Sequence, residues 1–222
     1  MRKQVVETGY DTLAGDYLAW STQVEGDPRD RFLQQLTRRL PDGACVLDLG
    51  CGAGLPSTRR LAERFEVVGV DLSEGQLRLA REHVPEAGFV RADLAEVAFH
   101  PASFAGITAF YSITHVPREE HAALFRSVAQ WLQPGGLFLA TLSAARGPDW
   151  TGEWLGVPMF FSGHDAETNR RLLQSAGFEL VLDEVVEMRE PEGTVSFLWV
   201  LARKEQTDAL SGECSTSLTS TP

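Results

Sequence analysis

The chain has 222 residues, a length typical of one α/β domain, and its 43% hydrophobic and 23% charged residues are ordinary for a globular protein. Its formal net charge of -11, with no long run of Lys or Arg, argues against nucleic acid or an anionic membrane surface as partner. Three cysteines without metal-ligand spacing argue against a zinc site or a disulfide framework. Without a signal-like or membrane-length apolar run, a cytoplasmic location is expected.

Residues 1–40 predict an N-terminal helical cap made of two helices with a turn between them. Gly26, Asp27 and Pro28 supply the chemistry of the turn. Asp27 is expected to cap the second helix, which is predicted to run from Arg29 to Leu40.

From residue 44 onwards, short apolar runs alternate with helical segments, which is the pattern of a mostly parallel sheet. A glycine loop follows the first strand, and a Pro-Gly-Gly turn precedes the fifth. The predicted strands are Ala44–Leu49, Glu66–Val70, Gly88–Arg91, Phe104–Tyr111 and Leu137–Leu142, and the predicted helices are Ser57–Phe65, Ser73–His83 and Arg118–Leu132.

Residues 144–163 are expected to form a long irregular loop that is rich in aromatic side chains. Such a loop either covers the edge of the sheet or serves as a lid and substrate wall, and the two interpretations stay open. A helix from Asp165 to Ala176 is expected to follow, closed by Gly177.

The last part of the chain predicts a hairpin and then a tail. Two extended runs, Phe178–Met188 and Thr194–Arg203, are joined by a short turn, so the final strand should be antiparallel to the others. Residues 205–222 are polar and rich in Ser and Thr, and disorder is expected there. A single domain is therefore predicted over residues 1–204.

The most informative motif is Val46–Gly54, in which three glycines follow a buried strand. Glycines let the backbone approach a ligand closely, and the start of the next helix adds free N–H groups. Leu55 stands where a dinucleotide fingerprint has its last glycine. Asp48, inside the strand, could bind the ammonium of an amino-acid ligand directly or through water. A carboxylate at this position would not help to bind an anionic pyrophosphate.

Two further acids follow the next two strands. Asp71 ends the second strand, where a carboxylate can accept hydrogen bonds from both hydroxyls of a ribose. Asp93 follows the third strand, where it can accept from the exocyclic amine of adenine. The three motifs together predict a site for an adenosine that carries an amino acid.

These motifs, with the turn at Gln133-Pro-Gly-Gly, resemble the class I S-adenosylmethionine-dependent methyltransferases over about residues 8–203. The resemblance implies an α/β, Rossmann-like sheet of seven strands in the order 3-2-1-4-5-7-6, with the last strand antiparallel. It implies S-adenosylmethionine as cofactor, with its methionine part at the glycine loop, its ribose at Asp71 and its adenine at Asp93. The cofactor-binding residues expected on this basis are Asp48, Gly50, Cys51, Gly52, Gly54, Asp71, Leu72, Ala92, Asp93, Leu94, Phe110 and Tyr17.

Two segments resemble the small-molecule branch of this family, namely Tyr10–Tyr17 and the run from Phe110 to Pro117. The acid that many relatives carry at the start of the fourth strand is absent from Phe104–Ile107, so no metal is expected. The Asn/Asp-Pro-Pro-aromatic motif of nucleic-acid amino methyltransferases is also missing. Methyl transfer to a small molecule is therefore predicted, with oxygen as the favoured acceptor atom.

His115 and His164 are the candidate catalytic bases, because histidine accepts a proton near neutral pH. Either could instead make only structural contacts with a neighbouring helix. The side chains expected at the substrate are aromatic: Tyr10, Trp20, Tyr111, Trp150, Trp154, Phe160 and Phe161.

Two other functions stay open at this stage. One is a non-catalytic module that binds S-adenosylmethionine, and the other, less favoured, is a dinucleotide-dependent oxidoreductase. The sequence leaves the oligomeric state open, and a homodimer is among the states considered.

Overall fold

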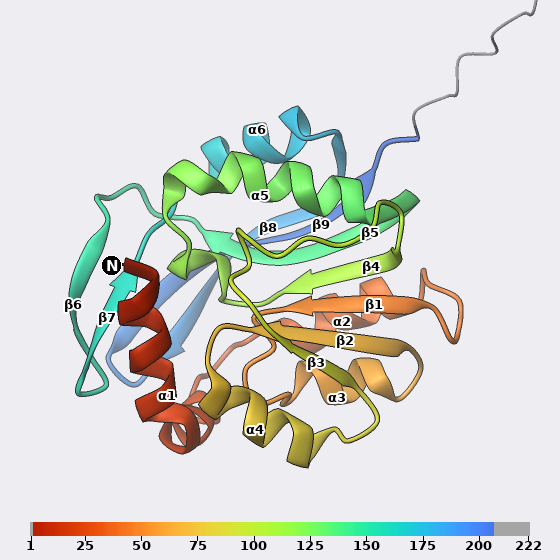
Figure 1. Ribbon diagram of the computed structural model, residues 1–222. Helices are drawn as coiled ribbons and strands as arrows, with labels where there is room; N and C mark the ends of the chain where they lie inside the picture. The colour runs from red at the N-terminus through yellow and green to blue at the C-terminus, as the bar shows by residue number, and fades with distance from the viewer. Residues whose placement is uncertain (1, 207–222) are drawn as a thin grey trace, which may run out of the picture.

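The computed structural model describes residues 2–206 and has a seven-stranded sheet at its centre (Figure 1). The strand order is β3-β2-β1-β4-β5-β9-β8. Pairs from β3 to β5 are parallel, and β9 is antiparallel to both β5 and β8. The strands are β1 (Cys45–Leu49), β2 (Glu66–Asp71), β3 (Gly88–Arg91), β4 (Phe104–Ala109), β5 (Leu132–Ser143), β8 (Phe178–Glu190) and β9 (Gly193–Lys204). Because β6 and β7 lie outside this sheet, the expected order with an antiparallel last strand is confirmed.

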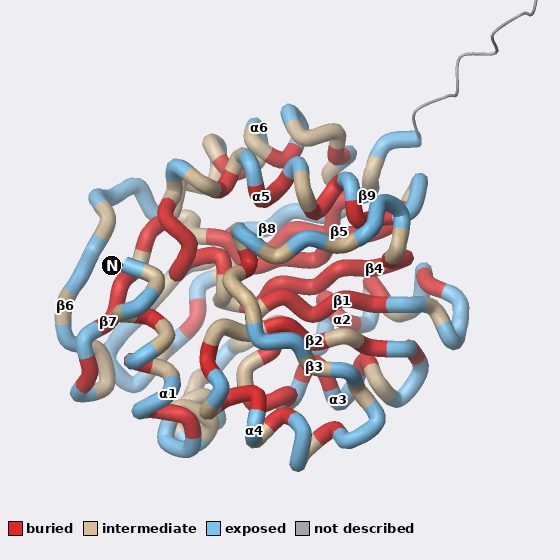
Figure 2. Tube along the Cα trace, viewed as in Figure 1, coloured by how far each residue is buried: buried red, intermediate tan, exposed pale blue. Residues whose placement is uncertain are grey.

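Helices cover both faces of the sheet. Side chains of α2 and α3 pack on one face, and side chains of α5 and α6 pack on the other. Both faces of the central strands are thus buried, as Figure 2 shows, which explains why these strands are continuous apolar runs. The helices are α1 (Arg2–Ser21), α2 (Arg29–Thr37), α3 (Ser57–Ala62), α4 (Glu74–His83), α5 (Arg118–Trp131) and α6 (Ala166–Ser175), with a short 3-10 helix η1 (Ile113–His115).

Residues 144–163 do not form the irregular loop that was expected. They contain a separate antiparallel hairpin, β6 (Trp150–Trp154) and β7 (Val157–Phe161). The hairpin packs against α1, where Val6 and Leu13 form a small core with side chains of β7. Pairing with β6 and burial of the apolar residues Val157, Met159 and Phe160 against α1 account for the difference.

Several predicted boundaries were also wrong. The second helix ends at Thr37 instead of Leu40, and Asp27 accepts a bond from the Arg29 backbone N–H while Pro28 holds the cap position. The fifth strand begins at Leu132 and includes the Pro-Gly-Gly segment.

The predicted tail falls almost wholly on residues 207–222, which lie outside the described residues. No helix within residues 2–206 is long and apolar enough to cross a membrane.

Trp199 on β9 is expected to be a major contributor to stability. Its side chain is 0% exposed and stacks on Phe32 of α2, with ring centroids 5.1 Å apart. Replacing it by Ala should lower the free energy of unfolding by about 3–5 kcal/mol, because a large buried ring leaves a cavity. Trp150→Ala, at a side chain that is 45% exposed, should cost less than about 1 kcal/mol. Urea unfolding of both variants tests this, and equal losses would contradict the packing described.

Candidate cofactor and acceptor site

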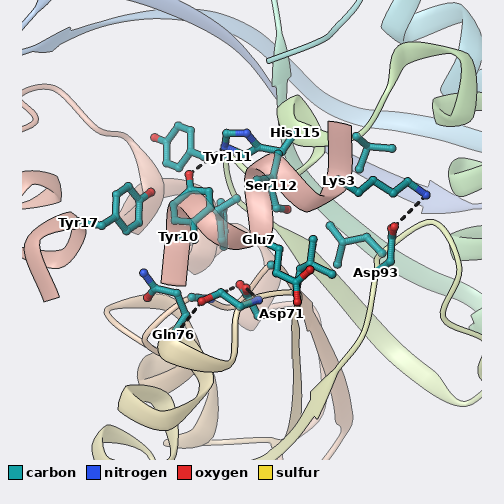
Figure 3. A pocket seen from close by; sticks show the side chains of 18 residues that line it. Lys3, Glu7, Tyr10, Tyr17, Asp71, Gln76, Asp93, Tyr111, Ser112 and His115 are labelled. Carbon is teal, nitrogen blue, oxygen red and sulfur yellow. Dashed lines mark hydrogen bonds and ion pairs between the residues drawn. The ribbon is translucent and has the colours of Figure 1, made fainter. Parts of the chain in front are cut away.

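A cleft of about 720 Å³ opens at the carboxyl ends of the parallel strands, where ligands bind in open α/β sheets. The first helix α1 closes it from outside, with Lys3, Glu7, Tyr10 and Tyr17 among the lining side chains (Figure 3). Eight of the residues expected to bind cofactor line this cleft. They are Tyr17 from α1, Gly50, Gly52, Asp71, Leu72, Asp93, Leu94 and Phe110.

The glycine loop after β1 is held in a conformation that favours glycine. Gly50 and Gly52 have φ angles of 74° and 54°. A Cβ on Gly50 would lie 2.1 Å from the Cβ of Ser112, so a side chain is excluded there. A Cβ on Gly52 would have Gln76 Oε1, 3.7 Å away, as its nearest neighbour, because this part of the loop faces the cleft. Gly54 faces α4 instead and shapes the loop without lining the cleft.

Asp71 joins this loop to the start of α4. One carboxylate oxygen accepts the Gly52 N–H and the other accepts the Ser73 N–H, both at 2.9 Å. Burial in the cleft raises the pKa of Asp71 to about 6, although these bonds act in the opposite direction. Nearby, Gln76 Oε1 is buried and accepts no hydrogen bond from the described residues. The floor of the cleft therefore presents acceptors to a ligand that brings hydrogen-bond donors.

Asp93 marks the other end of the cleft. Its Oδ2 lies 2.8 Å from Lys3 Nζ, and its Oδ1 accepts the Ala95 N–H. Lys3 also pairs with Glu96 and Glu120. Burial lowers the pKa of Lys3, but these three carboxylates outweigh it and raise the pKa above its ordinary value. The start of α1 is thus tied by ion pairs to the edge of the cleft.

Asp48, Cys51 and Ala92 do not line this cleft. Asp48 is buried and accepts hydrogen bonds from Thr58 Oγ1 at 2.7 Å and Thr108 Oγ1 at 2.8 Å. Asp48 and Cys51 line a smaller adjoining cavity that shares Gly50 and Gly52 with the cleft. Ala92 packs against the core. Asp48 therefore supports the glycine loop from within the sheet.

His115, in η1, lies where the cleft meets a second cavity. Its Nδ1 is 2.8 Å from the carbonyl oxygen of Phe160, and its Nε2 is 2.8 Å from the Tyr10 hydroxyl. A carbonyl can only accept, so Nδ1 carries the proton and Nε2 accepts from Tyr10. Burial lowers the pKa of His115 to about 4, so the ring is neutral at pH 7.

The second cavity, of about 490 Å³, is the aromatic chamber. It shares Tyr10, Tyr17, Tyr111 and His115 with the cleft. Three more of the predicted aromatic residues lie in its wall: Trp20, Trp154 and Phe161. Tyr111 has a φ of 58°, a left-handed conformation that is uncommon for a non-glycine residue and occurs here directly after β4.

Three predicted site residues lie elsewhere. His164 contacts the backbone carbonyl of Arg118 at 3.2 Å and lines neither cavity. Phe160 is 1% exposed in the core between β7 and α1. Trp150 is 45% exposed and lines a further cavity, which adjoins the chamber at Thr114, Phe161 and Phe197. Tertiary packing, which composition does not reveal, separates these residues from the others.

Sequence reasoning missed Lys3, Glu7, Gln76 and Ser112, all of which line the cleft. Gln76 follows Ser73 at capping-box spacing, and its backbone N–H does bond to the Ser73 hydroxyl, so the pattern indicated only a helix start. Ser112 lies within the Phe110–Pro117 run, where only the aromatic residues and His115 were considered, and Lys3 and Glu7 come from a segment that carries no recognisable motif. No group of three or more His, Cys, Asp or Glu side chains suited to a metal ion occurs within residues 2–206.

Comparison with known proteins finds methyltransferases. Residues 46–136 match the family model described as a methyltransferase domain. A ubiquinone biosynthesis O-methyltransferase of Leptothrix cholodnii is 33% identical over 122 residues, which cover 52% of this chain and 51% of that protein. A trans-aconitate 2-methyltransferase of Variovorax paradoxus is 41% identical over 116 residues, which cover 50% of this chain and 44% of that protein. The chain thus spans about half the length of these curated relatives.

A solved structure shares the fold over most of the chain. It is the 1,6-didemethyltoxoflavin-N1-methyltransferase of Burkholderia thailandensis, with a TM-score of 0.69 at 22% identity, covering 91% of this chain and 88% of that one. Residues 46–136 therefore match a methyltransferase domain, and the chain shares the fold of a solved methyltransferase that holds S-adenosylhomocysteine.

The His115 ring should make stability sensitive to acid. The unfolded chain takes up a proton below pH 6.5, whereas the folded protein does so only near pH 4, so acidification favours unfolding across this window. Relative to His115→Gln, the wild type should lose about 2 kcal/mol of unfolding free energy between pH 7 and pH 5. Urea titrations at both pH values measure this. Because Asp71 titrates in both proteins, its contribution cancels, and a pH-independent difference would contradict the buried neutral imidazole.

Proposed function

We propose that the protein transfers a methyl group from S-adenosylmethionine to a small-molecule acceptor held in the aromatic chamber, with oxygen as the acceptor atom. The observation that carries this proposal is the Tyr10–His115 hydrogen bond, which lies at the junction of the cofactor cleft and the chamber. The Leptothrix relative is an O-methyltransferase, which supports oxygen as the acceptor atom.

The residues of the cleft suit this cofactor. Asp71 and the unpartnered Gln76 Oε1 offer acceptors to the ribose hydroxyls, and the open backbone at Gly52 leaves room for the methionine part. Leu72 and Leu94 offer apolar contacts to the adenine, and Asp93 offers an acceptor that Lys3 holds in place. When bound, S-adenosylmethionine supplies a sulfonium methyl group, and the electron pair of the broken sulfur–carbon bond returns to sulfur to give S-adenosylhomocysteine.

The chain's own contribution is to align the acceptor, exclude water and receive a proton. As the acceptor oxygen forms its bond to the methyl carbon, its proton passes to the Tyr10 hydroxyl oxygen, and the Tyr10 proton passes to His115 Nε2. The charge on the imidazolium balances the charge lost from the sulfonium. We also propose that the hairpin closes the chamber, since Trp154 and Phe161 form part of its wall.

Binding of S-adenosylhomocysteine should depend on Asp71 and on pH. Ribose hydroxyls favour the ionised carboxylate, so affinity should weaken as the pH falls below about 6, and binding near that pH should release a proton. Asp71→Asn should weaken binding by roughly 10- to 100-fold and remove this pH dependence. Calorimetry in buffers of different ionisation enthalpy measures both quantities.

Asp42→Asn is the matched control, because Asp42 is exposed and pairs with Arg64 before β1, at the other end of the strands. The Asp42→Asn variant should bind S-adenosylhomocysteine as tightly as the wild type does. Tight binding of NADH in a parallel titration, or an Asp71→Asn variant that binds normally, would refute the cofactor assignment.

Activity should depend on the Tyr10–His115 pair. With an acceptor found by screening phenols, amines and thiols, His115→Gln should lower kcat by about 10²- to 10⁴-fold, the usual range for loss of a general base. Tyr10→Phe keeps the ring but removes the hydroxyl that relays the proton, so it should lower kcat by a similar factor. Affinity for S-adenosylhomocysteine should stay within about twofold in both variants, since neither side chain is assigned to the ribose or the methionine part.

His100→Gln provides the control, because His100 is exposed and lines neither cavity. A full kcat in His115→Gln, together with normal cofactor binding, would show that the transfer needs no base at this position.

A further inference from the structure

The walls of the aromatic chamber favour a flat ring. Trp20 stacks on Tyr17 with centroids 5.8 Å apart, and Trp154 meets the Trp20 ring edge-on at 5.2 Å. Phe161 meets Trp154 edge-on at 5.5 Å. Aromatic faces and edges at these spacings accept another ring with favourable geometry, and their faces also attract cations.

The charges of the chamber are not balanced. Besides His115, it is lined by the ionisable side chains Asp27, Arg29 and Glu190, together with tyrosines. Arg29 is paired with Asp27 at 3.1 Å, and its guanidinium lies 5.0 Å from the centre of the Tyr111 ring. These contacts neutralise the only cationic side chain in the wall.

Glu190 is left as the uncompensated charge. It is half-buried at the end of β8 and makes no ion pair or side-chain hydrogen bond with residues 2–206. Burial and the neighbouring Glu192 raise the pKa of Glu190, which shows that its environment lacks a positive partner. A bound cation would supply that partner, whereas a bound anion would add repulsion.

The position of Glu190 is set by the surrounding structure. The Trp20 indole N–H donates to both carboxylate oxygens of Glu192, at 3.1 and 3.2 Å, and so ties α1 to the turn after β8. The adjacent Arg189 exchanges backbone hydrogen bonds with Glu25. Glu190 is thus held on the same chamber that His115 lines.

We propose that the acceptor is an aromatic alcohol that carries a positively charged amine, with its hydroxyl at the Tyr10–His115 pair and its ammonium at Glu190. This inference rests on the proposed function, because it assigns the acceptor of that same site. The ring of the acceptor lies among the tryptophan and tyrosine side chains. Because Asp27 and Arg29 neutralise each other, this pair favours neither a cationic nor an anionic acceptor.

Three phenols of similar size test the charge preference: tyramine, para-ethylphenol and para-hydroxyphenylacetate. Each is titrated into the full-length protein saturated with S-adenosylhomocysteine, with binding followed by calorimetry. Tyramine should bind at least tenfold more tightly than para-hydroxyphenylacetate, with para-ethylphenol between them. Equal affinities, a preference for the carboxylate, or no binding of any of the three would overturn the inference.

Two variants locate the preference. Glu190→Gln should bring the three affinities to within about threefold, whereas Glu187→Gln, at an exposed position of the same strand outside the chamber wall, should keep the tyramine preference. A tyramine preference that survives in Glu190→Gln overturns the role of Glu190. If that variant does not fold, the order of the three phenol affinities in the wild-type protein still tests the charge preference. Binding of S-adenosylhomocysteine is measured first, since its absence contradicts the proposed function itself, and its presence without a phenol preference contradicts this inference alone.

Discussion

The Asp71 carboxylate is the contact on which the site depends. Its two oxygens bind the backbone N–H groups of Gly52 and Ser73, so it joins the loop after β1 to the start of α4. Since β1 and β2 are parallel neighbours, both loops meet at one edge of the sheet. The same geometry buries the Asp71 carboxylate. Burial destabilises its ionised form and so raises the pKa of Asp71. A ligand with paired hydroxyls relieves that cost, so the contact that shapes the cleft also prepares it for a ribose.

The remainder of the site is assembled from the two segments that lie outside the doubly wound core. The first helix α1 has no strong apolar face, and it is positioned by the hairpin core on one side and by the ion pairs of Lys3 on another. The hairpin in turn supplies the Phe160 carbonyl that orients His115. The acceptor side is therefore built by contacts between segments about 150 residues apart, and the cofactor side by neighbouring loops.

The cleft and the chamber draw on different parts of the chain. The glycine loop and Asp71 belong to the part that the family model covers, residues 46–136. The chamber takes most of its wall from α1, from the hairpin and from β8 and β9, all of which lie outside that range. A fold can keep one site while segments added to it shape another.

The sequence by itself determined the alternation of strands and helices, the glycine loop and the acid at the end of β2, because each follows from local backbone demands: period, turn chemistry and a glycine where a Cβ clashes. The order of the strands came from the resemblance to methyltransferases. It also indicated that the aromatic residues after β5 matter. Only the tertiary structure decided which of them reach the site: Trp154 and Phe161 face the chamber, while Phe160 and Trp150 do not. Likewise, His115 was separated from His164 by the partners that each ring meets across the fold. Neighbouring side chains of a strand point to opposite sides, which separates Phe160 from Phe161. Trp154 reaches the chamber by packing against Tyr17 and Trp20 of α1, and no local pattern encodes a contact between segments so far apart in the chain.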